Sequence, residues 1–145
     1  MECFWNGFEK MSEYTSEQNI KDIGTHGKSW ESSGRKLRYG YLGVPAAIAG
    51  WNMTKNPLLR AGAAAVGVGG SLVGYAGERK MDYGKGLQTI GKFVRGEKPT
   101  EQEWNHLIMN NPSGSLISHV HPELRPRLAK KWSDEYNRFQ GKAKQ

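Results

Sequence analysis

Two stretches without a charged side chain dominate the pattern of hydrophobic and polar positions along this chain. The first, YGYLGVPAAIAGWNMT, covers residues 39–54, and the second, AGAAAVGVGGSLVGYAG, covers residues 61–77. Between them, Lys55-Asn56-Pro57 has the composition of a turn, because proline ends one helix and can open the next. The pattern therefore predicts a Gly/Ala-rich helical hairpin over residues 39–77, with its first helix ending near Trp51.

The residues of this hairpin are unusually small. Residues 61–77 include six glycines and five alanines, many of them four positions apart. Small residues at that spacing form ridges that let two helix backbones approach closely, as in membrane glycine zippers. The predicted packing residues are Gly43, Ala47 and Gly50 in the first run and Ala63, Gly67, Gly70, Ser71 and Gly74 in the second.

The length and the flanks of the second run are compatible with a membrane. Seventeen helical residues span roughly 25 Å, against about 30 Å of bilayer hydrocarbon. Only five of them are large, so a lone helix would be poorly held and a close helical partner is needed. Both a membrane-inserted hairpin and a water-soluble hairpin with a tight Ala/Gly seam satisfy this requirement. Aromatic residues predicted to lie at a membrane interface are Phe4, Trp5, Phe8, Tyr39, Tyr41 and Trp51.

The basic residues around the hairpin indicate which side of a membrane its two ends would face. Five of them flank its two open ends, whereas the predicted turn has only Lys55 and Arg60. The excess of Lys and Arg on one side of a membrane marks the cytoplasmic face, so both chain ends are expected there. The five flanking residues are Arg35, Lys36, Arg38, Arg79 and Lys80.

The rest of the chain predicts a mainly α protein of short helices around the hairpin. Residues 1–38 are interpreted as an amphipathic N-terminal helix followed by a polar linker, since residues 14–38 are interrupted by Gly and Ser. Residues 78–145 form a basic helical region. In it, Thr100 and Glu103 have the spacing of a capping box, residues 110–114 read as a turn, and a last helix starts near Pro122 or Pro126. Leu116–Val120 is the one short strand candidate.

The charge of the chain points to an anionic partner. The formal net charge is +7, and residues 78–145 contribute thirteen Lys/Arg against eight Asp/Glu. Lipid headgroups, acidic partner subunits and nucleic acid all fit this balance. The predicted anion-contacting residues on the last helix are Arg125, Arg127, Lys130, Lys131 and Arg138. A soluble nucleic-acid-binding or packaging protein, using this helix and its aromatic residues, is the alternative function.

Catalytic and cofactor signatures are weak. The glycine-rich run lacks the Gly-Lys-Ser/Thr of a phosphate loop, and Leu72 stands where the third glycine of GxGxxG would fall. His119 and His121 would share one face of a strand and could hold a metal with His106, although a loop pair is the simpler interpretation. A hydrolase using either histidine ranks last, and Cys3 is the only cysteine. We therefore expect no enzyme, no cofactor and no small-molecule substrate.

A short sequence at the N-terminus carries a resemblance to a known group of proteins. CFWNGFEKM, with Phe4, Gly7, Phe8, Glu9 and Lys10, resembles an F-x-x-G-F-E-K opening of small tailed-bacteriophage proteins. The Gly/Ala-rich centre also resembles virion and ejection-type proteins that associate with membranes. The resemblance implies a non-enzymatic structural or accessory protein, located in a virion or at a host membrane and otherwise in the cytoplasm. Its partners would be membrane lipid or other subunits, with self-association possible.

Overall fold

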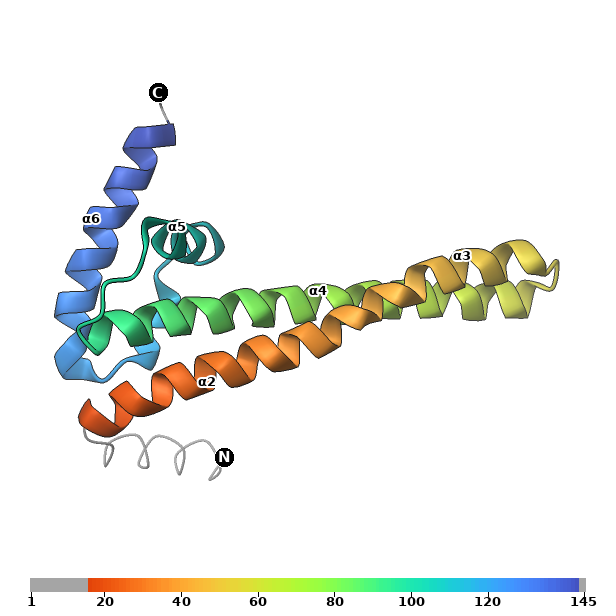
Figure 1. The fold of residues 1–145 in the computed structure, drawn as a ribbon. Helices are drawn as coiled ribbons and strands as arrows, with labels where there is room; N and C mark the ends of the chain where they lie inside the picture. The colour runs from red at the N-terminus through yellow and green to blue at the C-terminus, as the bar shows by residue number, and fades with distance from the viewer. Residues whose placement is uncertain (1–15, 144–145) are drawn as a thin grey trace, which may run out of the picture. The chain divides into compact units, whose positions relative to one another are not determined.

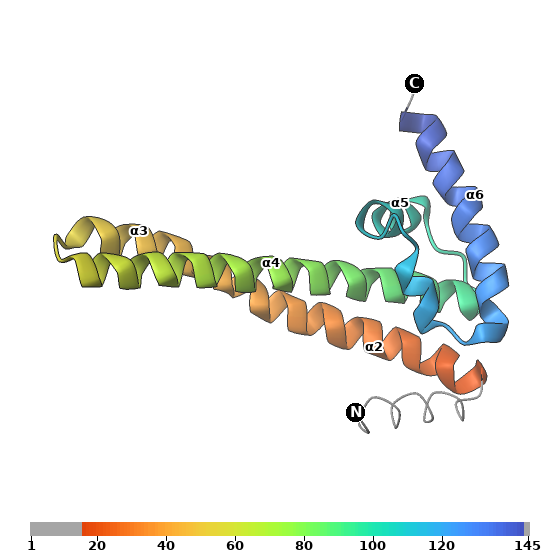
Figure 2. The same cartoon turned by 180° about the vertical axis from the view of Figure 1, so that it is seen from behind.

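The computed structural model describes residues 16–143 and divides them between two compact units (Figures 1 and 2). The hairpin unit is Ser29–Gly84, and the bundle unit comprises residues 16–28 and 85–143. The fold is mainly α, as predicted, and the described residues include no strand. The segment Leu116–Val120, considered as a strand, instead contains the 3-10 helix η2 (Ser115–His119).

The elements follow one another as helices joined by short connections. The order is α2 (Ser16–Leu37), η1 (Arg38–Leu42), α3 (Gly43–Met53), α4 (Pro57–Val94), α5 (Glu101–Asn110), η2, η3 (Pro122–Leu124) and α6 (Arg125–Ala143). Helix α4 is continuous from the predicted segment 61–77 into the basic region that starts at residue 78, and it contributes residues to each unit.

Helix α2 corrects one prediction. Residues 14–38 were expected to be a partly extended linker, but Ser16–Leu37 is helical. The residues on its packed side are Ile20, Ile23, Gly27, Trp30 and Gly34, which alternate in steps of three and four. That spacing is helical, and the signal is hidden because two of the five are glycines, which the sequence interpretation treated as breakers.

In the hairpin unit, η1 and α3 run antiparallel to the first part of α4, as both views show (Figures 1 and 2). The turn comprises Thr54, Lys55 and Asn56, in agreement with the predicted turn at 55–57. The Asn56 side chain accepts a hydrogen bond from the Leu58 backbone N–H at 2.9 Å, which satisfies one of the unpaired donors at the start of α4.

The bundle unit has an ordinary apolar core. Leu87 and Ile90 of α4, Leu107 and Ile108 of α5 and Leu128 of α6 are each at most 2% exposed. Helix α5 begins with the predicted capping box, in which the Thr100 side chain accepts from the Glu103 N–H and the Glu103 carboxylate accepts from the Thr100 N–H. The positive φ values of Gly96 (84°) and Gly114 (66°) occur after the end of α4 and just before η2, where glycine carries no steric cost.

Candidate membrane-inserting hairpin

The two arms of the hairpin are in backbone contact. A Cβ atom added to Gly70 would lie 2.5 Å from the Gly40 carbonyl oxygen, and one added to Gly40 would lie 2.8 Å from the Gly70 carbonyl oxygen. Near the open end, a Cβ on Gly34 would lie 2.5 Å from the Gly77 carbonyl oxygen. Such distances leave no room for any side chain, so glycine is required at these positions.

The predicted packing residues face this seam, with one change of pattern. Gly43 lies against Val66 and Gly70, Gly67 against Ala47, and Gly50 against Ala63. Along α4, the residues at the seam are Ala63, Gly67, Gly70, Gly74 and Gly77, in steps of four and three. An average step of 3.5 keeps one stripe of a helix facing its neighbour over many turns, as in a coiled coil.

The purely four-residue ridges considered from the sequence do not extend along the seam. Ser71 is half-buried, and its hydroxyl donates to the Gly67 carbonyl at 2.8 Å within the same helix. Gly69 has no atom within 4 Å of an added Cβ. Three seam glycines, Gly34, Gly40 and Gly77, were not predicted as packing residues. Gly34 was assigned to a linker, Gly77 was taken as the end of the run, and Gly40 was left out of the packing set.

Large apolar side chains cover the outside of this hairpin. Fourteen large hydrophobic residues are exposed among the described residues, and all but Met109 belong to Ser29–Gly84. Only Ala47 of the hairpin is among the buried hydrophobic residues. Small residues line the contact between the arms and large apolar residues lie outside it, a distribution that membrane helices also use. The exposed residues of the hairpin are Leu37, Tyr39, Leu42, Ile48, Trp51, Met53, Leu58, Leu59, Val66, Val68, Leu72, Val73 and Tyr75.

The uncharged parts of the two arms match in length. On α4 the uncharged segment between Arg60 and Glu78 spans roughly 25 Å, at 1.5 Å per residue. On the other arm, residues 39–42 of η1 and helix α3 together rise about 25 Å, using about 2 Å per residue for a 3-10 helix. Among the described residues, α4 is the one helix long and apolar enough to cross a membrane by length and composition.

Polar side chains close both ends of the hairpin. At the turn, Arg60 Nε donates to the Thr54 carbonyl at 2.8 Å, and its guanidinium lies 5.4 Å from the centre of the Trp51 ring. At the open end, the Tyr41 hydroxyl is 3.1 Å from one Glu78 carboxylate oxygen, and Arg38 Nε is 3.5 Å from the other. Arg60, Arg38 and Glu78 therefore each have a partner of suitable polarity next to the apolar segments.

The structure describes three of the six aromatic residues that were predicted to lie at a membrane interface. Tyr39 is 69% exposed and lies at the open end, whereas Trp51 is half exposed near the turn. The Tyr41 ring packs over Gly74, where an added Cβ would meet it at 2.6 Å. Tyr39 and Trp51 thus sit near opposite ends of the uncharged segments. Phe4, Trp5 and Phe8 lie outside the described residues.

Most of the predicted anion-contacting residues make contacts within the bundle unit. Arg125 donates to the carbonyls of Val120 at 2.8 Å and Ser118 at 2.9 Å. Arg127 lies 5.2 Å from the Phe93 ring centre. Lys131 pairs with Glu135 at 2.7 Å, and Arg138 approaches both Glu135 and Glu101. Lys130 is exposed. These basic side chains are therefore largely used to hold helix ends and neighbouring helices.

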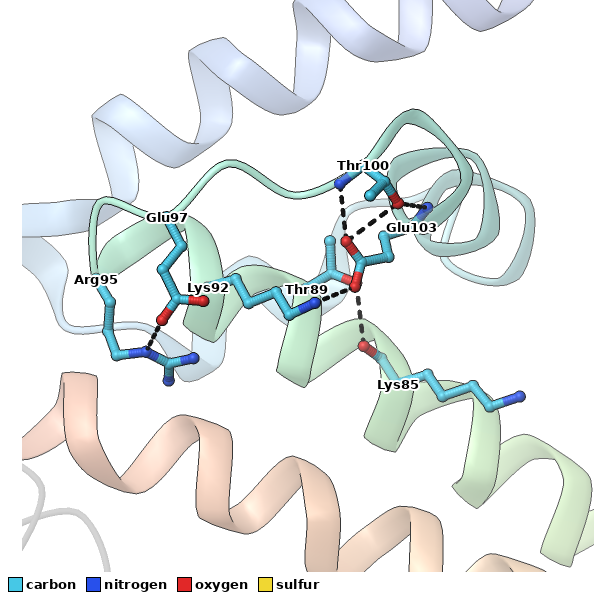
Figure 3. A network of polar contacts seen from close by, with 7 residues as sticks. All are labelled: Lys85, Thr89, Lys92, Arg95, Glu97, Thr100 and Glu103. Carbon is cyan, nitrogen blue, oxygen red and sulfur yellow. Dashed lines mark hydrogen bonds and ion pairs between the residues drawn. The ribbon is translucent and has the colours of Figure 1, made fainter.

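A polar network connects α4 and α5 in the same unit (Figure 3). The Lys92 ammonium pairs with the Glu103 carboxylate, which also accepts from the Thr100 backbone N–H at 2.8 Å. The Lys92 contact and the Thr100 hydrogen bonds favour the ionised carboxylate and lower the pKa of Glu103. A hydrogen bond from Lys142 likewise lowers the pKa of Glu101. The network fastens α5 to α4 and α6.

The histidines do not assemble a metal site in the described part of the chain. The His121 backbone N–H donates to Asn19 Oδ1 at 3.0 Å, and Asn19 Nδ2 donates to the His119 carbonyl at 3.3 Å. Helix η2 replaces the strand that would have aligned the two imidazoles. Among the described residues, no group of three or more His, Cys, Asp or Glu side chains is placed to bind a metal ion.

Comparison with known proteins identifies no relative of this chain. No protein-family model, curated protein or solved structure matches the chain. The functional assignment therefore depends on the chemistry of the hairpin itself.

Proposed function

We propose that this protein is a non-enzymatic structural or accessory component of a larger assembly, and that it associates with a membrane by inserting the Ser29–Gly84 hairpin. The observation that carries the proposal is the distribution of side-chain size, with glycine and alanine inside the hairpin and large apolar residues outside it. The N-terminal resemblance suggests a virion or a host membrane as the place of that assembly.

The energetics of insertion follow from this distribution. Side chains such as Leu42, Ile48 and Leu72 are more than half exposed in water, and moving them into hydrocarbon is favourable by about 25 cal/mol per Å² of apolar surface. Helical backbones carry their hydrogen bonds within each arm, as a bilayer requires. The seam supplies close van der Waals packing, which holds helices together where lipid competes for apolar contact.

The width of the bilayer fits the hairpin with a small mismatch. The uncharged segments of about 25 Å are a few ångströms shorter than the hydrocarbon layer. A bilayer accommodates such a mismatch by thinning locally, or long side chains at the ends of the segment extend to the headgroup region. Lys55 and Arg60 at the turn, and Arg38 and Arg79 at the open end, have aliphatic stems that serve this purpose. The larger number of Lys and Arg at the open end favours a cytoplasmic location for both arms' outer ends.

Nucleic-acid binding, the alternative suggested by charge, has less support. Arg125, Lys131 and Arg138 make contacts within the bundle unit, so fewer cations of α6 are available for phosphate groups. The salt dependence of any binding to DNA or RNA would measure how many phosphates are neutralised.

The proposal is tested by flotation of the full-length protein with phosphatidylcholine vesicles, followed by a carbonate wash. We expect the wild type to float and to resist the wash. Gly70→Leu and Gly74→Leu, which force a side chain into the seam, should bind less or be extracted. Gly69→Leu is the matched control, because it adds the same side chain where no atom lies within 4 Å. A wild-type protein that stays wholly soluble as a monomer would refute the proposal.

A further inference from the structure

A cationic hollow lies at the open end of the hairpin, within the hairpin unit. Its volume is about 430 Å³, and it is lined by Arg35, Arg38, Tyr39, Tyr41 and Leu42. The hollow combines two guanidinium groups with a tyrosine and a leucine that are both more than 60% exposed. This is the composition of a site for a molecule with an anionic head and an apolar tail.

The hollow lies where the uncharged segments begin. Arg35 is on the last turn of α2, and Arg38 opens η1, immediately before the uncharged run of residues 39–54. If the hairpin is inserted as proposed above, this level corresponds to the headgroup region of the bilayer. The inference therefore rests on the proposed function.

The two guanidinium groups retain binding capacity. Arg35 Nη2 donates to Glu31 at 3.0 Å, and Arg38 Nε faces Glu78 at 3.5 Å. Each described contact engages one nitrogen, whereas a guanidinium carries five N–H donors in a planar fork suited to phosphate oxygens. The side chains of Arg35 and Arg38 are 70% and 57% exposed, so a phosphate can reach both.

We infer that this hollow binds the headgroup phosphate of an anionic phospholipid. Arg35 and Arg38 pair with the phosphate, and the exposed Tyr39 and Leu42 side chains lie along the upper part of an acyl chain. Charge complementarity favours a lipid such as phosphatidylglycerol over zwitterionic phosphatidylcholine. The site would thereby fix the depth and the rotation of the hairpin in the bilayer.

The test compares binding of the full-length protein to phosphatidylcholine vesicles and to vesicles that also contain phosphatidylglycerol. The wild type should prefer the phosphatidylglycerol vesicles. Each cation near an anionic surface contributes about fivefold, so the loss of any two cations lowers the preference by about 25-fold. Arg35→Gln/Arg38→Gln should lose clearly more than this, because it also removes the direct contacts with the phosphate. Lys36→Gln/Lys80→Gln is the control: it removes two cations flanking the same end of the hairpin, neither of which lines the hollow. Circular dichroism checks that both variants retain their helices.

Several results would overturn the inference. Equal losses in the two double variants would assign the preference to diffuse charge, and no loss in either would remove the site. Inorganic phosphate without vesicles distinguishes the two sources of the anion. If it binds the wild type but not Arg35→Gln/Arg38→Gln, while both proteins keep the same vesicle preference, the ligand is free phosphate and not lipid. A wild type that binds both vesicle types equally contradicts this site alone. A wild type that binds neither vesicle type contradicts the proposed function as well.

Discussion

The hairpin unit and the bundle unit use opposite rules for the placement of large side chains. In the bundle, Trp104, Leu107 and Leu128 are buried, and charged groups such as Glu101 and Arg138 cover the surface. In the hairpin, the inside is glycine and alanine, and the outside includes Leu42, Leu72 and Tyr75. The bundle therefore has an ordinary apolar core, whereas the hairpin leaves its large apolar side chains exposed and packs its arms through small residues.

The largest expected effect is a contrast between identical substitutions in the two units. Leu107→Ala should lower the free energy of unfolding by about 2–5 kcal/mol, because it removes a side chain that is 1% exposed and leaves a cavity. Leu72→Ala, at a side chain 65% exposed, should change it by less than about 0.5 kcal/mol. Thermal unfolding of both variants measures the difference.

The same pair has a second readout. Leu72→Ala should weaken partitioning into vesicles by up to about threefold, because a leucine at the centre of an inserted helix contributes about 0.3–0.6 kcal/mol. Leu107→Ala should leave partitioning of the folded protein unchanged. The comparison fails if Leu72→Ala destabilises the soluble protein as much as Leu107→Ala does.

The next largest effect is a difference in stability between alanine substitutions at two adjacent glycines. Gly70→Ala should destabilise the hairpin by about 1–3 kcal/mol, as expected for overpacking, since its Cβ would lie 2.5 Å from the Gly40 carbonyl. Gly69→Ala should stabilise it by up to about 1 kcal/mol, because alanine is the better helix former and the added Cβ meets open space. Thermal unfolding in detergent micelles tests the two signs. Equal effects of the two substitutions on stability would contradict the assignment of Gly70 to the contact between the two arms.

A smaller effect concerns the helix start in the bundle. Thr100→Ala removes the side chain that accepts from the Glu103 N–H and should cost about 1 kcal/mol. Ser118→Ala, on an exposed hydroxyl that bonds to the Ser115 carbonyl, is a matched loss of one side-chain oxygen. Urea unfolding should show a clearly larger shift for Thr100→Ala, and a reversed order would argue against the capping box.

The smallest effect is a pH dependence of the bundle. The pKa of Glu103 is lowered in the folded state, so its contribution to stability is fully present above the unfolded value near 4.5 and is lost as the pH falls through the folded value. The melting temperature should therefore drop on acidification. Glu103→Gln should flatten this drop, whereas Glu123→Gln, at a carboxylate 74% exposed, should leave it unchanged. Identical profiles for the two variants would contradict this assignment.

The sequence predicted the helical class, the turn at 55–57 and the capping box because each depends on local residue types. It did not predict helix α2, since Gly27 and Gly34 were treated as breakers, although Gly27 is buried and Gly34 packs against the Gly77 backbone. The sequence also did not determine which set of small residues on the second helix contacts the first. The set that faces α3 is determined by the antiparallel neighbour, and steps of four alone would rotate away from that neighbour along α4. The pairing of Arg138 with Glu101 of α5 likewise depends on packing between distant segments.

The central claim is that the large outer side chains of the hairpin face lipid. The direct test places a nitroxide at position 72 through Leu72→Cys, with Cys3→Ser to remove the native thiol, and measures its collision rates with oxygen and with a water-soluble nickel complex in vesicles. The account predicts that collisions with oxygen dominate, and that the same label at Lys130→Cys shows the reverse. A label at position 72 that is as accessible to the nickel complex as the one at position 130 would contradict the account.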